Sequence, residues 1–300
     1  MSFDVIVVGG SFAGQAAALQ LARARRKVVL VDAGAPRNRF AAHSHGFLGH
    51  DGKAPAQILS ESIDQLLRYP TMDLRQGMAS SAVRAGDGFR VILDDGDTLE
   101  ARRLILALGV RDELPSLPGL AERWGQTVVH CPYCHGYELD GPLGVLATHP
   151  SSVHQALLVP DWGPTTLFTQ GLLEPDEAEL AQLANRGVRI ERQPVAELLG
   201  KAPHLDGVRL ADGRIVPVRG LFVAPRTSVA SPLAEQLGCE LDAGLLGSVI
   251  RVDGMQQTSA PGVFAAGDAA THFGNATRAA STGVMAGVAA HRSLFMGVAA

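Results

Sequence analysis

The chain has 300 residues, of which 46% are hydrophobic and 19% charged, so it has ample material for an apolar core and intrinsic disorder is excluded. A net charge of −4, with no run of lysines or arginines, argues against a nucleic-acid or membrane-surface binder. Three cysteines are too few for a secreted disulfide scaffold. Met1–Asp4 carries no basic targeting region, and Arg278, His291 and Arg292 interrupt the apolar C-terminal stretch. These features predict a soluble, cytoplasmic α/β protein.

A strand, a glycine-rich turn, a helix and a second strand follow one another at the N-terminus. Residues 5–8 are a short apolar run, as expected for a strand that is buried on both faces. Helix-forming residues occupy 15–25, and a second apolar run over 27–31 ends at Asp32. This order and length predict a βαβ unit.

The turn after the first strand predicts a dinucleotide site. Gly9 permits the tight turn and Gly14 permits close helix–strand packing, whereas Ser11 replaces the usual middle glycine. Asp32 is placed to bind a ribose hydroxyl, and the helix N-terminus to bind the pyrophosphate. A purely structural turn is the alternative, and the ordered strand, helix and acid disfavour it. The expected cofactor-binding residues of this segment are Gly9, Ser11, Phe12, Ala13, Gly14 and Asp32.

Two hairpins, about half a chain apart, each lead into a buried strand. Such a duplication predicts two related nucleotide-binding halves rather than one large sheet. A further buried strand over 141–147, followed by a helix over 153–159, lies between the two copies. The expected hairpin strands are 89–93 with 98–108, and 208–210 with 215–218; hinges are expected near 114–119 and 241–250.

The segment Cys131-Pro132-Tyr133-Cys134 holds two of the three cysteines. Thiols at this spacing can close a disulfide across one helical turn, and a helix N-terminus lowers the pKa of an exposed thiolate. Pro132 suits the first turn of such a helix. The pattern therefore predicts a redox-active pair.

Metal binding is the alternative for this segment. Cys131 and Cys134 could form half of a zinc site with His130 or His135, but a structural site needs four ligands and no second Cys-x-x-Cys exists. The remaining cysteine, Cys239, is expected to be a buried structural thiol.

Three further histidines lie close together in the sequence. A metal site is possible there, but no carboxylate stands at a matching spacing, so surface or cofactor-facing histidines are favoured and no metal site is expected. These residues are His43, His45 and His50.

A dinucleotide fold followed by a mid-chain Cys-x-x-Cys resembles the low-molecular-weight thioredoxin reductase family. Residues 258–268 resemble the second flavin motif of that family, in which Gly267 and Asp268 would contact FAD, with Asp268 on the ribityl chain. Ser281-Thr282-Gly283 would open the last helix, and the stretch ending at Gly109 resembles the family's strand motif before the first hinge.

This resemblance implies two Rossmann-like, three-layer α/β domains, the second inserted into the first. The FAD domain would comprise residues 1–112 and 241–300, and the inserted NAD(P)H-type domain residues 113–240. It also implies a homodimer in which Cys134 faces the flavin and Cys131 exchanges with substrate.

The sequence departs from the family where NADPH should bind. The expected glycine-rich turn reads Thr148-His149-Pro150-Ser151-Ser152, and its side chains would obstruct a pyrophosphate. Residues 167–171 lack the arginines that hold a 2′-phosphate, and residues 272–277 replace the family's Arg-Gln-Ala. The sequence thus predicts a domain that persists after its NADPH site has been lost.

His135 stands where the family usually has an aspartate. The run Cys-Pro-Tyr-Cys-His-Gly-Tyr-Glu is similar to flavin-dependent dithiol oxidases that close disulfides in small natural products such as gliotoxin. An imidazole can take a thiol proton and return it near neutral pH, so His135 is expected to manage protons.

The predicted enzyme is an FAD-dependent thiol-disulfide oxidoreductase that uses Cys131, Cys134 and His135. Its substrate would be a small-molecule dithiol or disulfide, or a thioredoxin-like protein, and its electron acceptor oxygen or another carrier. The alternatives are an NADPH- or ferredoxin-dependent thioredoxin reductase, a non-catalytic redox-sensing flavoprotein and a zinc-binding module.

Overall fold

The predicted N-terminal βαβ unit is present in the computed structural model, which describes residues 2–296. It consists of β1 (Ser2–Val8), α1 (Phe12–Arg23) and β2 (Val28–Asp32). β1 lies between β2 and β6 (Thr98–Leu106) and runs parallel to both. Its apolar residues Val5–Val8 are buried, as expected for a central parallel strand.

β1 belongs to a seven-stranded sheet with the order β3-β2-β1-β6-β5-β4. β6 is long enough to have different partners along its length: its first half is antiparallel to β5, and residues 104–106 run parallel to β19. The turn between β5 and β6 contains Gly96 with φ +91°, which suits glycine. The other strands of this sheet are β3 (Met72–Gln76), β4 (Ala79–Ala85), β5 (Gly88–Leu93) and β19 (Val263–Ala265).

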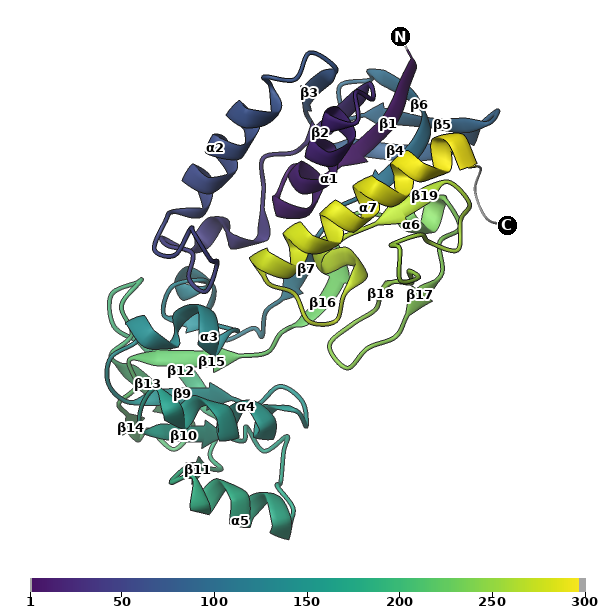
Figure 1. Ribbon diagram of the computed structural model, residues 1–300. Helices are drawn as coiled ribbons and strands as arrows, with labels where there is room; N and C mark the ends of the chain where they lie inside the picture. Colours follow the sequence, from purple (N-terminus) through teal and green to yellow (C-terminus); the bar gives the residue numbers. More distant parts are fainter. Residues whose placement is uncertain (1, 297–300) are drawn as a thin grey trace. The chain divides into compact units, whose positions relative to one another are not determined.

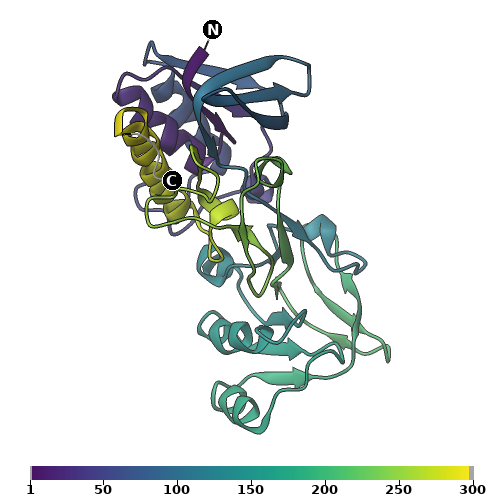
Figure 2. The ribbon, with the colours of Figure 1, turned by 90° about the vertical axis from the view of Figure 1, so that its right-hand side faces the viewer.

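Helices α1 and α7 (Ala276–Met296) lie side by side over one face of this sheet (Figures 1 and 2). Their close approach depends on two glycines of α7. A Cβ on Gly283 would clash with the carbonyl oxygen of Ala13, and one on Gly287 would press on the backbone of Ala17. The opposite face is covered by the β4–β5 hairpin and by α6 (Leu233–Gln236), and α2 (Pro55–Leu66) lies beside α1.

The start of the last helix differs from the prediction. We expected Ser281-Thr282-Gly283 to open it, but α7 begins five residues earlier, at Ala276. The Asn275 side chain explains this start, because its Oδ1 accepts a hydrogen bond of 2.7 Å from the Arg278 N–H. Gly283 instead serves the contact with α1 within the helix.

A second, five-stranded sheet is entirely parallel, with the order β11-β10-β9-β15-β8. Alternate residues of its strands face two separate apolar clusters. One lies under α4 (Ser152–Leu158) and α5 (Glu177–Asn185), and the other under the antiparallel sheet β12-β13-β14. The strands are β8 (Val128–Val129), β9 (Leu143–Leu146), β10 (Thr165–Phe168), β11 (Arg189–Glu191), β12 (Val195–Leu199), β13 (Gly207–Leu210), β14 (Ile215–Val216) and β15 (Gly220–Val223).

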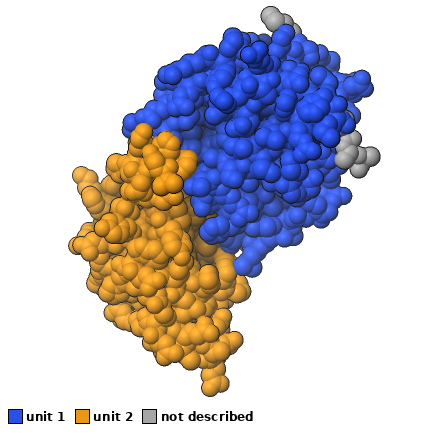
Figure 3. Space-filling view, in the orientation of Figure 1, with its two compact units in different colours: residues 1–39, 55–111, 227–300 blue, residues 40–54, 112–226 orange. Residues whose placement is uncertain are grey.

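The two sheets belong to two compact units (Figure 3). The first unit comprises residues 1–39, 55–111 and 227–300, and the second comprises 40–54 and 112–226. The chain passes between them in β7 (Val110–Glu113) and β16 (Arg226–Val229), which pair with each other. Two short strands of the first unit, β17 (Leu241–Asp242) and β18 (Val249–Ile250), form a separate pair.

These units differ from the predicted boundaries of 112/113 and 240/241 in two places. Residues 227–240 join the first unit because Leu233 and Ala234 of α6 are buried in its core and Gln236 accepts a hydrogen bond from the Ala82 N–H. Residues 40–54 join the second unit, where Phe40 packs against Gly125. No helix among residues 2–296 has the length and apolar character needed to cross a membrane.

Candidate active site

The two cysteines of the Cys-x-x-Cys segment are joined by a disulfide at the start of a one-turn helix. Helix α3 (Pro132–His135) follows β8, with Cys131 at its N-cap and Pro132 at its first position. The Cα atoms of Cys131 and Cys134 are 5.3 Å apart. The predicted pair, and the predicted position of the proline, are therefore present in the structure.

Neighbouring elements of the second unit hold this short helix in place. Trp162, which follows a 3₁₀ turn η4 (Val159–Asp161), packs so closely on Gly136 that a Cβ there would lie 2.7 Å from the indole Cγ. The ring of Tyr133 meets the same indole edge-on, with 5.3 Å between centroids. Gln155 of α4 donates from Nε2 to the His130 carbonyl oxygen at 2.8 Å. A glycine is needed at 136 because the tryptophan fills the space of a side chain.

His135 ends this helix and is half-buried. Burial lowers the pKa of its imidazole below the ordinary value of 6.5, and His45 lowers it further, whereas Glu138 acts in the opposite direction. Glu138 lies in the 3₁₀ turn η3 (Gly136–Glu138) that follows α3. A lowered pKa leaves the imidazole neutral near pH 7, which is the form that accepts a proton.

The three histidines of residues 40–54 lie in the second unit. His45 lies between two carboxylates: Nε2 is 3.5 Å from Oε1 of Glu138 and Nδ1 is 3.6 Å from Oδ1 of Asp51. Sequence reasoning did not pair either acid with His45, because Asp51 is adjacent to His50 and Glu138 is remote in the chain. His43 interacts through Nδ1 with the Gly52 carbonyl oxygen at 3.0 Å.

The structure also bears on the metal-binding alternative. Within the part of the chain that the structure describes, no three side chains of His, Cys, Asp or Glu are arranged to hold a metal ion. The sulfur atoms of Cys131 and Cys134 are bonded to each other. Cys239 is buried in the first unit, where burial raises the pKa of its thiol and its sulfur lies 3.6 Å from Thr258 Oγ1. This position agrees with a structural thiol.

The glycine-rich turn of the first unit is built for close backbone approach. Gly9 has φ +107°, and a Cβ there would clash with the Ala107 carbonyl. A Cβ on Gly14 would clash with the carbonyl oxygen of Gly9. Ser11 is the N-cap of α1 but makes no side-chain cap hydrogen bond. The first-turn N–H groups of this twelve-residue helix are thus not capped by its side chain, which suits an anionic group.

Asp32 lies at the end of β2, directly beside this turn. Its Oδ1 accepts hydrogen bonds from the N–H groups of Gly10, at 3.3 Å, and Gly34, at 3.1 Å. A Cβ on Gly10 would overlap the carboxyl group of Asp32. Gly10 is therefore the residue that allows the acid to approach the turn.

The C-terminal motif that contains Gly267 and Asp268 lies beside the start of α1. Gly267, with φ +73°, lies against α1, where its Cβ would be 2.9 Å from that of Ala13. Its N–H donates to Thr282 Oγ1 at 2.9 Å. Asp268 follows it, in the 3₁₀ turn η5 (Gly267–Ala270). Gly109, with φ +67°, accepts a hydrogen bond from the Ala230 N–H at 3.1 Å. The structure thus brings residues from both ends of the chain to one edge of the first sheet.

Sequence reasoning missed Arg37 at this edge. Arg37, in the 3₁₀ turn η1 (Arg37–Phe40), donates from Nη1 to Oδ2 of Asp268 at 2.8 Å, and both side chains are about four-fifths buried, with exposures of 23% and 19%. The run Pro36-Arg37-Asn38-Arg39 directly after the Asp32 strand was the available signal. The N-terminus of α1, the glycines at the close contacts of the turn and the Arg37 guanidinium together fit a dinucleotide such as FAD.

The equivalent turn of the second unit, between β9 and α4, is closed by its own side chains. The Thr148 N–H donates to Ser152 Oγ at 3.2 Å, and the Ser151 N–H donates to His149 Nδ1 at 3.2 Å. Ser152 is fully buried, and Thr148 Oγ1 donates to the Ala224 carbonyl oxygen at 2.8 Å. Two backbone N–H groups of this turn, those of Thr148 and Ser151, are therefore already bonded to side chains of the turn itself.

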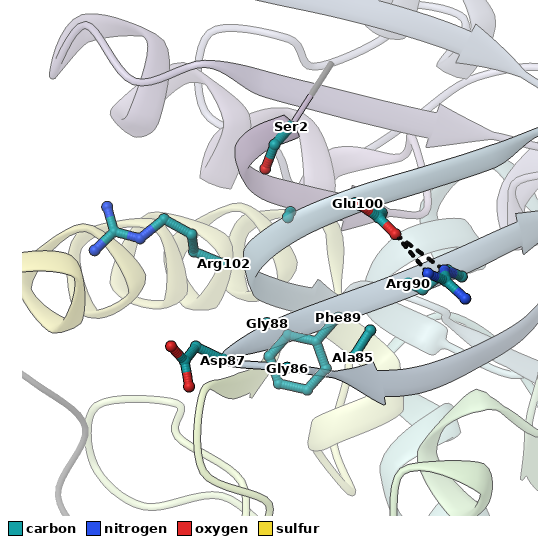
Figure 4. Close-up of a pocket in the computed structure, with 10 residues that line it drawn as sticks. Ser2, Ala85, Gly86, Asp87, Gly88, Phe89, Arg90, Glu100 and Arg102 are labelled. Atoms are coloured by element: carbon teal, nitrogen blue, oxygen red, sulfur yellow. Dashed lines mark hydrogen bonds and ion pairs between the residues drawn. The ribbon is translucent and has the colours of Figure 1, made fainter.

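A surface pocket of about 310 Å³ lies at the opposite end of the first sheet (Figure 4). The turn between β4 and β5 forms one side of it, and Arg90 and Glu100 form an ion pair of 2.8 Å along its rim. Ser2, at the start of β1, also lines it, whereas the glycine-rich turn follows the carboxyl end of β1. Dinucleotides bind at the carboxyl ends of parallel strands, so this pocket is separate from the candidate site.

The chain has a disulfide at a helix N-terminus, and each of its two units contains parallel strands followed by helices. Only the β–α turn of the first unit is open to a dinucleotide. Together these features define the class of protein as a disulfide oxidoreductase. Residues 3–142 and 173–283 match the family described as pyridine nucleotide-disulphide oxidoreductase. The chain belongs to this family, whose members are flavoproteins, and it is an enzyme of the thioredoxin reductase-like type.

Similar proteins match along nearly the whole chain. Thioredoxin reductase sirT of Leptosphaeria maculans is 33% identical, with 95% of this chain and 92% of that protein covered. Thioredoxin reductase tcpT of Claviceps purpurea is also 33% identical, with 97% and 94% covered. The crystal structure of an oxidoreductase from Agrobacterium tumefaciens is 52% identical with a TM-score of 0.94, covering 98% of this chain and 99% of that one. The crystal structure of HlmI is 40% identical with a TM-score of 0.90, covering 98% and 92%.

Proposed function

We propose that this enzyme is an FAD-dependent dithiol oxidase that does not use NADPH. The observation that supports this most is the contrast between the two β–α turns. The turn before α1 has glycines at its close contacts, whereas the turn before α4 has no glycine and its Thr148 and Ser151 N–H groups donate to the side chains of Ser152 and His149. The pyrophosphate site before α1 is therefore retained, whereas side chains of the chain itself occupy the corresponding site before α4.

The end of β10, where arginines would hold a 2′-phosphate, has none between residues 167 and 171. Gln170, at the end of β10, accepts a hydrogen bond from the Val195 N–H at 3.2 Å. The nearby Arg192 forms a 2.7 Å ion pair with Glu174. A guanidinium that is engaged by a carboxylate on both its Nε and Nη2 is poorly placed to hold a phosphate.

The chemistry proposed for the chain is a two-step disulfide exchange. A substrate thiolate attacks Sγ of Cys131, so that the Cys131–Cys134 bond breaks and Cys134 leaves as a thiolate. The second substrate thiolate then attacks the mixed disulfide, and Cys131 leaves. The substrate is oxidised to its disulfide and the enzyme pair is reduced by two electrons. His135 takes a proton from the substrate thiol and returns it to a departing thiolate.

FAD, when bound, would accept the two electrons and pass them to oxygen or another acceptor. The Gly9–Gly14 turn, Asp32 and the Arg37–Asp268 pair would hold it. The substrate class that fits this chemistry is a small-molecule dithiol, with a thioredoxin-like protein as the alternative. The homodimer and the cytoplasmic location remain predictions.

Anaerobic titration of the purified flavoprotein tests this proposal. NADPH, NADH and dithiothreitol are added in separate cuvettes while the flavin absorbance is followed. We expect only dithiothreitol to bleach the flavin, and air to restore the colour. Prompt bleaching by NADPH would overturn the proposal and favour an ordinary NADPH-dependent thioredoxin reductase.

A cysteine variant tests the route through the disulfide. In Cys134→Ser the enzyme disulfide cannot form, so bleaching by dithiothreitol should be lost while the flavin remains bound. Cys239→Ser is the matched control, because that thiol lies in the first unit and should not affect bleaching. Unchanged bleaching in Cys134→Ser would contradict the mechanism.

A further inference from the structure

Residues 40–54 are distant in sequence from α3, the helix that begins at the Cys131–Cys134 disulfide, but they contact the turn η3 that follows it. This segment departs from the first unit after residue 39, packs in the second unit and returns at residue 55. His45 is the residue of this segment that contacts η3, the turn after α3. The imidazole is mostly buried, with 22% of its side chain exposed, and its Nε2 is 3.5 Å from the Glu138 carboxylate.

Asp51 provides a second carboxylate on the other side of the His45 imidazole. Its carboxylate lies 3.6 Å from Nδ1 of His45, so both ring nitrogens of His45 face carboxylates. Asp51 also accepts a hydrogen bond of 2.8 Å from the Gly46 N–H, which ties it to the loop that carries His45. The order of contacts is Asp51, His45 and Glu138, and Glu138 in η3 follows His135 by three residues.

The groups around His135 come from a small number of elements. Glu138 in η3 and His45 in residues 40–54 are the charged or titratable groups that act on it most strongly. Gln155 of α4 bonds the His130 carbonyl before the helix, and Trp162 packs on Gly136 after it; neither side chain titrates. His43 lies beyond His45, with 6.3 Å between their ring centroids.

We propose that Glu138 and His45 are positioning residues that set how readily His135 exchanges a proton during thiol oxidation. This inference rests on the proposed function, because it assigns a purpose to the proton transfer at His135. Glu138 stabilises the imidazolium that forms when His135 takes a proton. His45 opposes it, and also holds the Glu138 carboxylate in place with Asp51 behind it.

The two residues act on His135 in opposite directions, which a merely structural role would not produce. Removing the carboxylate in Glu138→Gln should lower the pKa of His135, and removing the imidazole in His45→Asn should raise it. We expect both shifts to be small and opposite in sign, since both groups are partly exposed. Asp140→Asn removes a nearby exposed carboxylate and should produce no shift.

Two measurements on the flavin-loaded protein test the inference. The first is NMR titration of ¹⁵N-labelled histidine, with His135 assigned by its loss in His135→Gln. The second is the pH dependence of flavin bleaching by dithiothreitol. Opposite shifts in both measurements would support the inference, whereas shifts of the same sign, or none, would overturn it.

The design separates this inference from the proposed function. If dithiothreitol fails to bleach the flavin at any pH, the proposed function fails, and the NMR titration still tests how Glu138 and His45 act on His135. If bleaching occurs normally but the NMR shifts are absent, the dithiol oxidase stands and the assignment of these two residues is wrong. Flavin content and circular dichroism show whether each variant is folded.

Discussion

Arg37 and Asp268 are 231 positions apart in the sequence, yet the guanidinium donates to the carboxylate across 2.8 Å. Arg37 follows the strand that ends in Asp32, and Asp268 follows β19. A carboxylate at the edge where an anionic cofactor is proposed to bind would repel it. The adjacent guanidinium offsets this charge and fixes the carboxylate for hydrogen bonding to hydroxyl groups.

Replacing this arginine should weaken flavin binding. In Arg37→Gln the Asp268 carboxylate loses its cation, and we expect the Kd for FAD to rise about tenfold, which corresponds to about 1.4 kcal/mol. Flavin fluorescence during titration of the apoprotein measures the Kd. Arg39→Gln, two residues away and exposed, is the control. An unchanged Kd in Arg37→Gln would show that the pair has no part in binding.

The lowered pKa of His135 should determine how the rate of flavin bleaching by dithiothreitol falls at acid pH. Because burial favours the neutral imidazole, the base form persists as the pH falls, and it is lost only below the ordinary value of 6.5. The rate of flavin bleaching by dithiothreitol should therefore fall below pH 6.5, and this limb should vanish in His135→Gln. Stopped-flow absorbance under nitrogen gives the rates. A limb above pH 6.5, or one that survives the substitution, would remove His135 from the mechanism.

The turn before α4 should tolerate little change, although it binds no cofactor in the proposed function. Ser152→Ala leaves the partly buried N–H of Thr148 without its acceptor, so we expect a loss of about 1–3 kcal/mol in the free energy of unfolding. Urea unfolding followed by circular dichroism measures it. Ser62→Ala, which removes a hydroxyl bonded to its own helix at Ile58, should cost less than about 0.5 kcal/mol. Equal losses in both variants would mean that the Ser152 bond does not stabilise the turn.

Gly14 should be irreplaceable for steric reasons. In Gly14→Ala the new methyl group meets the carbonyl oxygen of Gly9, and helix and strand must separate at a cost of about 1–3 kcal/mol. Flavin retention through gel filtration should fall together with stability. Gly254→Ala provides the comparison, because its Cβ would meet no atom within 4 Å. Full flavin retention in Gly14→Ala would argue against a cofactor at this turn.

The local patterns were predictable because they depend on neighbours in the sequence. Apolar residues at 5–8, glycines at 9 and 14 and an acid at 32 define the first βαβ unit through periodicity and backbone sterics. Pro132 between Cys131 and Cys134 indicates a helix start, and the structure has one there. The glycine-free turn at 148–152 was visible in the sequence, although its internal hydrogen bonds were not.

The start of α7 and the extent of the units were harder to predict. Asn275 is a good N-cap, but nothing local distinguishes it from Ser281, and the packing of α7 on α1 decides between them. Residues 227–240 belong to the first unit because Leu233 packs in its core, and the sequence alone does not show which core a leucine joins. Contacts between remote segments carry no signal in a single sequence.

The sequence by itself determined the first βαβ unit, the Cys131–Cys134 pair at a helix start and the glycine-free turn at 148–152, because each depends on residues close together in the chain. The tertiary structure alone decided that Arg37 meets Asp268 and that His45 lies between Asp51 and Glu138. These charged contacts join segments that only the packed core brings together. The physical reason is that periodicity and sterics act locally along the chain, whereas electrostatic neighbours are set by the fold.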